Sequence, residues 1–79
     1  MHKFPRDAPK EKELKVLNRL SFEFVREGNH IALLRKNSDG TATPLTLPNH
    51  SKIKASTLRI ILNHSRITPQ EFLEAYYYK

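Results

Sequence analysis

The sequence predicts an α+β fold in which antiparallel strands lie between helices. Apolar residues recur at helical spacing near both ends of the chain, and apolar and polar residues alternate in its middle. A first helix is expected over about residues 10–20, where Leu14, Leu17 and Leu20 share one face. Pro9 suits the start of this helix because its fixed φ is compatible with the first turn.

Alternation of apolar and polar residues predicts three strands after this helix. We expect them over about residues 22–27, 30–35 and 41–47. Gly28 and Asn29 indicate a tight turn between the first two strands, since both residue types tolerate positive φ. Residues 37–40 indicate a second hairpin. Pro44 cannot donate a ladder hydrogen bond, so the third strand is expected at a sheet edge.

Two further helices are expected after a loop over residues 48–51. Apolar residues at helical spacing predict one helix over about residues 55–65. Thr68, Pro69 and Glu71 form a good start signal for a short last helix. We therefore divide the chain into a loose leader (1–9), one domain (10–75) and a tail (76–79).

The order of elements is helix, three strands, helix and a short C-terminal helix. Three meandering strands with helices on one face form a two-layer α+β sandwich. Double-stranded-RNA-binding domains share this order, and they recognise the shape, phosphates and 2′-hydroxyls of RNA. A common fold does not by itself establish a common function.

The charge of the chain is strongly positive and unevenly distributed. The 79 residues carry a formal net charge of +6, and no acidic residue lies between Asp39 and Glu71. Lys52, Lys54 and Arg59 fall inside that stretch, which favours a polyanionic partner. There is no cysteine and no apolar run long enough to span a bilayer, so a cytoplasmic location without a membrane association is expected.

Histidine is the most suitable catalytic residue type in this sequence, since cysteine is absent and acids are few. We find no phosphate-binding glycine loop, zinc-protease motif or serine-nucleophile motif. The spacing of His2, His30, His50 and His64 matches no zinc pattern, so neither a metal nor a cofactor is expected. His30 opens a strand directly after a turn, where an imidazole is accessible and can take a proton from a ribose 2′-hydroxyl. The alternative is a surface histidine without a role.

A second group of polar residues surrounds the start of the helix expected at residue 55. Free backbone N–H groups, hydroxyls and ammonium groups together bind phosphate well. The residues concerned are Ser51, Lys52, Lys54, Ser56 and Thr57. The alternative is ordinary helix capping with solvated lysines, and the two interpretations are compatible. His50 precedes this group and either orients a substrate or bonds within its loop.

Several segments together resemble a known family. After the leucine-bearing first helix they are Phe22–His30, Pro48–His50, Lys54–Ile61 and Ile67–Phe72. In this order they are similar to the HicA family, the toxin half of HicA–HicB toxin–antitoxin systems. The resemblance covers about residues 10–75, and its specificity lies in the ordered set rather than in any one segment.

This resemblance implies a double-stranded-RNA-binding-like fold and endoribonuclease activity on mRNA. It also implies one essential histidine, which corresponds to His30, and a HicB-type antitoxin that masks that site. Two positions depart from the family pattern. Asn29 replaces the commoner serine or threonine, and asparagine still hydrogen-bonds locally. Ala55 replaces a glycine at the helix start, where a methyl group weakens a close backbone approach to phosphate.

The sequence therefore predicts an mRNA-cleaving endoribonuclease with His30 as general base or acid. Water or His50 is the second proton carrier. The residues expected to bind RNA are Asn29, His50, Lys52, Lys54, Ser56, Thr57 and Arg59. Two rival functions stay open. One is a non-catalytic RNA-binding module, and the other is an interaction protein whose basic surface is incidental.

Overall fold

The computed structural model describes residues 5–78 as an α+β domain with three helices and two antiparallel sheets. The elements are β1 (Asp7–Pro9), α1 (Lys10–Arg19), β2 (Glu23–Glu27), β3 (His30–Lys36), β4 (Ala42–Pro48), β5 (Lys52–Lys54), α2 (Ala55–His64) and α3 (Pro69–Tyr76). Within residues 5–78, no helix is both long and apolar enough to cross a lipid bilayer. The predicted helices and long strands are confirmed to within one or two residues at their ends.

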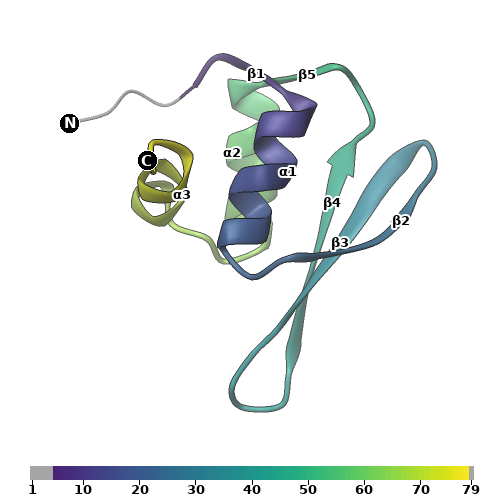
Figure 1. Cartoon of the computed structure of the whole chain (residues 1–79), viewed down its shortest axis with the longest axis vertical. Helices are drawn as coiled ribbons and strands as arrows, with labels where there is room; N and C mark the ends of the chain where they lie inside the picture. The colour runs from purple at the N-terminus through teal and green to yellow at the C-terminus, as the bar shows by residue number, and fades with distance from the viewer. Residues whose placement is uncertain (1–4, 79) are drawn as a thin grey trace.

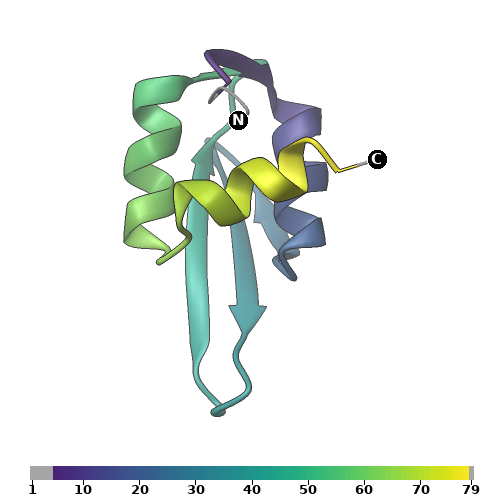
Figure 2. The same ribbon diagram turned by 90° about the vertical axis from the view of Figure 1, so that its left-hand side faces the viewer.

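The helices lie on one side of the sheet formed by β2, β3 and β4. Helices α1 and α2 cover that face, and α3 crosses both of them on the side away from the sheet (Figure 1 and Figure 2). The hairpin between β3 and β4 extends past the helices at one end of the molecule (Figure 1). The α+β sandwich expected from the sequence is confirmed at this level.

The three-stranded sheet has the order β2-β3-β4, so β4 is an edge strand, as Pro44 predicts. Ile31 and Leu33 of β3 are buried beneath the helices, and so are Leu45 and Leu47 of β4. Successive strand residues point to opposite faces. His30, which precedes Ile31, therefore faces away from the helices.

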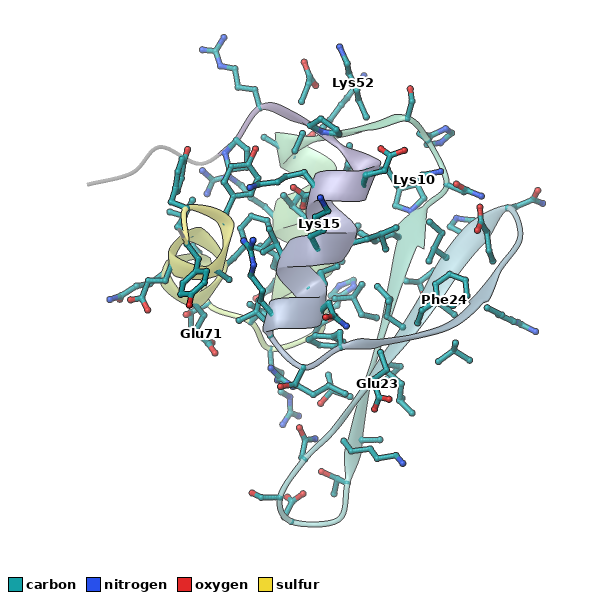
Figure 3. All side chains as sticks on the ribbon, in the orientation of Figure 1. Lys10, Lys15, Glu23, Phe24, Lys52 and Glu71 are labelled. Atoms are coloured by element: carbon teal, nitrogen blue, oxygen red, sulfur yellow. The ribbon has the colours of Figure 1, made fainter. Side chains whose placement is uncertain are left out.

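The other edge strand, β2, departs from the sequence prediction. Alternation of apolar and polar residues is typical of a half-buried strand, but every residue from Glu23 to Glu27 is exposed, and Phe24 is 56% exposed. The pairing with β3 shifts between Phe24 and Arg26, so Val25 forms a bulge that interrupts the alternation. In Figure 3, Phe24 lies beside β2 and away from α1.

A second, two-stranded sheet joins β1 to β5, and the sequence analysis did not anticipate it. Ala8 of β1 and Ile53 of β5 are paired and buried. The prediction of a loose leader is therefore wrong for Asp7–Pro9, while residues 1–4 lie outside the described part of the chain. Strands of three residues are too short to show a periodicity, and their partners lie far apart in the sequence.

One apolar cluster forms the core between the sheet and the helices. It consists of Val16, Leu17, Phe22, Ile31, Leu33, Leu45, Leu47, Ile53, Leu58, Leu62, Ile67 and Phe72. Glu13 of α1 is buried with 0% of its surface exposed, and neither carboxylate oxygen has a hydrogen-bond partner in residues 5–78. Burial of this unpaired group raises the pKa of Glu13 to about 7, while the Lys12 charge lowers it to a smaller extent.

Helix α3 begins with the capping box that the sequence predicts. The hydroxyl of Thr68 accepts a hydrogen bond from the Glu71 N–H (3.1 Å), and the Glu71 carboxylate accepts one from the Thr68 N–H (3.0 Å). Phe72 is buried, and the ring centroid of Tyr76 lies 5.8 Å from that of Phe72. Tyr76 therefore belongs to α3, whereas Tyr78 is exposed at the end of the described chain.

Loss of the Thr68 cap is expected to lower stability moderately. In Thr68→Ala, the Glu71 N–H loses its acceptor, which costs about 1 kcal/mol of the free energy of unfolding. For a domain of this size the thermal midpoint falls by about 4–8 °C. Thermal unfolding followed by circular dichroism measures the change. Ser38→Ala removes an exposed hydroxyl that has no hydrogen bond to residues 5–78, so an equal fall in that control would contradict the prediction.

Candidate functional site

His30 lies at the rim of the three-stranded sheet. It is the first residue of β3 and pairs with Pro48, the last residue of β4. Its side chain is exposed and forms no hydrogen bond with the described part of the chain. An imidazole in this position is open to a large substrate. The pairing of the His30 backbone with β4 fixes the point from which the side chain projects.

The turn before His30 is tight, as predicted, but for a different reason. The Gly28 N–H donates to the His30 carbonyl oxygen at 3.0 Å and closes the turn. Neither Gly28 nor Asn29 has a positive φ, so the tolerance of positive φ that the sequence analysis invoked is not used here. Both residues are exposed, which leaves the Asn29 side chain open to a ligand next to His30.

The loop between β4 and β5 lies against this turn. The Asn49 N–H donates to the Asn29 carbonyl oxygen at 3.2 Å, which extends the ladder of β3 and β4 by one step. At the start of α1, the Lys10 N–H donates to the Ser51 carbonyl oxygen at 2.9 Å. His50 stands between these two bonds and is exposed. The fold therefore brings His50 to the same end of the molecule as His30.

A basic hollow of about 340 Å³ opens at this end. It is lined by Pro48, His50, Lys52, Ile53, Lys54 and Thr57. Pro48 is the residue that pairs with His30, so the hollow begins beside the rim that carries His30. Ile53 is buried beneath the hollow, whereas Lys52 and Lys54 are exposed. Figure 3 shows Lys52 at this end of the molecule, beyond the start of α1, where Lys10 lies.

The start of α2 has no competing cap. Lys54 is the N-cap residue, no side chain of residues 5–78 caps the helix, and its first turn contains no acid. The capping interpretation of Ser56 and Thr57 is therefore wrong, because neither hydroxyl binds the helix end. The first N–H groups of α2 can thus donate to a phosphate beside Thr57. One acid is close, since Asp7 of β1 pairs with Lys54 and reduces the local positive charge.

The structure gathers most of the predicted site residues but not all of them. Asn29, His30 and His50 belong to the rim, and Lys52, Lys54 and Thr57 belong to the hollow beside it. Ser56 and Arg59 are exposed on α2 and do not line the hollow. Among residues 5–78, no group of three or more His, Asp or Glu side chains is placed to hold a metal ion, and His2 lies outside that range.

Sequence reasoning assigned no role to two residues that join the rim to the rest of the fold. The Lys10 ammonium group donates to the Asn49 side-chain oxygen at 2.7 Å across 39 positions of sequence. Asn49 stands within the Pro48–His50 segment, but that segment does not indicate which distant residue it meets. A basic residue just after Pro9 is equally unremarkable by itself.

Comparison of the chain with protein-family models, with curated proteins and with solved structures finds no match. The resemblance to HicA therefore depends on the sequence segments described above.

Proposed function

We propose that this protein is a HicA-like endoribonuclease that cleaves mRNA with His30. One observation carries the proposal, namely that an exposed imidazole and a basic hollow share one rim of the fold, joined through the pairing of His30 with Pro48. A group that moves a proton and a group that binds phosphate are the two requirements for cleaving RNA without a protein nucleophile.

The arrangement of elements agrees with this proposal. Helix α1, strands β2 to β4 and helix α2 follow one another in the order of a double-stranded-RNA-binding-like domain, with both helices on one face of the sheet. The β1–β5 pair and α3 are additions to that order. We propose the double-stranded-RNA-binding-like class on this similarity of order and layers.

His30 acts on the ribose at the cleaved bond. As general base, its imidazole takes the proton of the 2′-hydroxyl, and the 2′-oxygen attacks the adjacent phosphorus. The bond from phosphorus to the 5′-oxygen breaks, and that oxygen takes a proton from water or from His50. The products are a 2′,3′-cyclic phosphate and a 5′-hydroxyl end. If His30 is instead the acid, it supplies the second proton and another group takes the first.

The basic hollow binds the RNA backbone in this proposal. Lys52 and Lys54 attract phosphates, and the Thr57 hydroxyl and the start of α2 donate hydrogen bonds to them. Ser56 and Arg59 extend the contact along α2, and Asn29 and His50 contact nucleotides at the rim. Donors aimed at the reacting phosphate also stabilise the negative charge that develops on it.

The same rim is where a HicB-type antitoxin is proposed to bind. A protein that covers His30 and the hollow excludes RNA from both. The turn before His30 follows β2, an edge strand whose residues are all exposed, so a partner protein can reach this turn and His30 together. The cellular setting proposed for toxin, antitoxin and mRNA is the cytoplasm.

A cleavage assay tests the proposal directly. The purified chain, freed of any bound protein, is incubated in the presence of EDTA with an RNA oligonucleotide and with the same oligonucleotide built from 2′-deoxyribose. We expect cleavage of the RNA alone, with 2′,3′-cyclic phosphate ends identified by mass spectrometry. Absence of cleavage together with RNA affinity that falls steeply with salt would favour the non-catalytic RNA-binding module. Absence of both would favour the interaction protein.

A further inference from the structure

The turn that carries His30 has little packing to hold it. Every residue from Glu23 to His30 is exposed, and β2 has only β3 as a neighbour in the sheet. Gly28 adds no side chain, and a methyl group placed on it would meet no atom within 4 Å. A catalytic group must nevertheless stay within a fraction of an ångström of its productive position. Something other than packing therefore has to fix this turn.

Asn49 makes the hydrogen bonds that fix it. Its side-chain Nδ2 donates to the Gly28 carbonyl oxygen at 2.9 Å and to the Glu27 carboxylate at 3.0 Å. Its backbone N–H donates to the Asn29 carbonyl oxygen at 3.2 Å. Three consecutive residues of the turn are thus held by one residue of the β4–β5 loop. No other side chain of residues 5–78 hydrogen-bonds to Gly28 or Asn29.

Asn49 is itself anchored to α1. Its Oδ1 accepts from the Lys10 ammonium group at 2.7 Å, so both ends of the side-chain amide are engaged. The amide lies between a cation and an anion, with its oxygen toward Lys10 and its nitrogen toward Glu27. This arrangement suits an asparagine, since an aspartate has no N–H to donate and would repel the Glu27 carboxylate.

We propose that Asn49 is a positioning residue, which fixes the Glu27–Asn29 turn and thereby His30 for RNA cleavage. The inference rests on the proposed function of His30. Asn49 does not touch the reacting atoms in this proposal. It acts through the backbone of the turn, and Lys10 supports it from α1.

The test compares Asn49→Asp with wild type and with Asn63→Asp. Aspartate keeps the shape of asparagine and the backbone N–H bond to Asn29, but it removes the two side-chain hydrogen bonds to Gly28 and Glu27. Asn63 is exposed on α2, so its replacement makes the same change of charge away from the rim. With a saturating RNA oligonucleotide, we expect Asn49→Asp to lower kcat by about 10- to 100-fold, the scale of a small misplacement of a catalytic group. KM should change less than about threefold, and Asn63→Asp should retain the wild-type kcat.

A second measurement reports the backbone mobility of the turn independently of activity. Backbone ¹⁵N relaxation is expected to show lower order parameters for Gly28, Asn29 and His30 in Asn49→Asp, with the buried residues of β3 unchanged. If wild type cleaves RNA and Asn49→Asp has the same kcat, the proposal is overturned. If wild type does not cleave RNA, the proposed function fails, and the positioning of the turn is then decided by relaxation alone. Unchanged order parameters would overturn it, and lower ones would support it.

Discussion

Replacing His30 by alanine is expected to lower the rate of RNA cleavage by about 10²- to 10⁴-fold, which is what one positioned general base or acid contributes. The fold should survive the change. The side chain is exposed and forms no hydrogen bond with residues 5–78, so the free energy of unfolding should change by less than about 0.5 kcal/mol. Single-turnover cleavage of an RNA oligonucleotide, together with thermal unfolding of the same sample, measures both quantities.

The matched control for this change is His64→Ala. His64 is exposed at the end of α2, whereas the basic hollow lies at the start of that helix. The His64→Ala variant should therefore cleave RNA at the wild-type rate. A companion variant, His50→Ala, is compared at saturating RNA, where weaker RNA binding does not limit the rate and a fall shows that His50 rather than water supplies the second proton. Equal cleavage by wild type and His30→Ala would show that His30 is not catalytic.

The same pair of proteins can be compared in cells. Induction of wild type is expected to arrest growth and degrade mRNA, and induction of His30→Ala is expected to do neither. Equal growth arrest by both proteins would contradict the assignment of His30 even if RNA were bound.

Local sequence signals predicted the elements that depend on local contacts. The alternation through Ile31 and Leu33 places β3 and gives its buried face, because neighbouring strand residues point to opposite sides. Thr68 and Glu71 predict the start of α3, because the capping box is closed within four residues. The position of His30 at the start of β3 follows from the same signals.

Contacts between distant segments were not predictable in this way. The pairing of Ala8 with Ile53 and the hydrogen bond of Lys10 to Asn49 join residues that are far apart in the sequence. No spacing or motif in the sequence links the two members of either pair. The bulge at Val25 interrupts an alternation that reads as regular in the sequence. As a result, the sequence located His30 but not the network that fixes the turn before it.

Glu13 is a different case, because its burial does follow from helical spacing. Val16 and Leu17 lie three and four residues further along α1 and are both buried, which places Glu13 on the same face. A charged residue on that face conflicts with the apolar pattern and is easily taken for a solvated one. The structure shows that the carboxyl group is enclosed, and this has a consequence for stability.

Ionisation of Glu13 is expected to destabilise the fold as pH rises. Burial raises the pKa of Glu13 to about 7, while the unfolded chain has the ordinary value of 4.5. The folded state therefore binds the proton more tightly. The stabilising contribution is fully present below pH 4.5 and is lost as pH rises through 7. The loss amounts to about 3 kcal/mol, a large part of the stability of a domain this small.

The variant that isolates this effect is Glu13→Gln. Glutamine has nearly the same volume and does not ionise, so its free energy of unfolding should fall about 2.5 kcal/mol less than that of wild type between pH 5 and pH 8.5. Urea unfolding at several pH values gives both curves. Hydrogen bonds from Thr41 lower the pKa of Asp39, so Asp39 loses its stabilising contribution only as pH falls below this range and does not interfere.

Glu11→Gln provides the control, because Glu11 lies on the same helix and is exposed. The free energy of unfolding of Glu11→Gln should change with pH in parallel with that of wild type. If Glu13→Gln also runs parallel, the carboxyl group is paired or solvated in solution, and its burial has no energetic consequence. If Glu13→Gln alone makes the free energy of unfolding less dependent on pH, protonation of Glu13 stabilises the packing of α1 in the core. Helix α3 packs against α1, and burial together with the Glu13 charge raises the pKa of Tyr76 in α3. Loss of the proton should therefore loosen α3 first, which hydrogen exchange at Phe72 and Leu73 would detect.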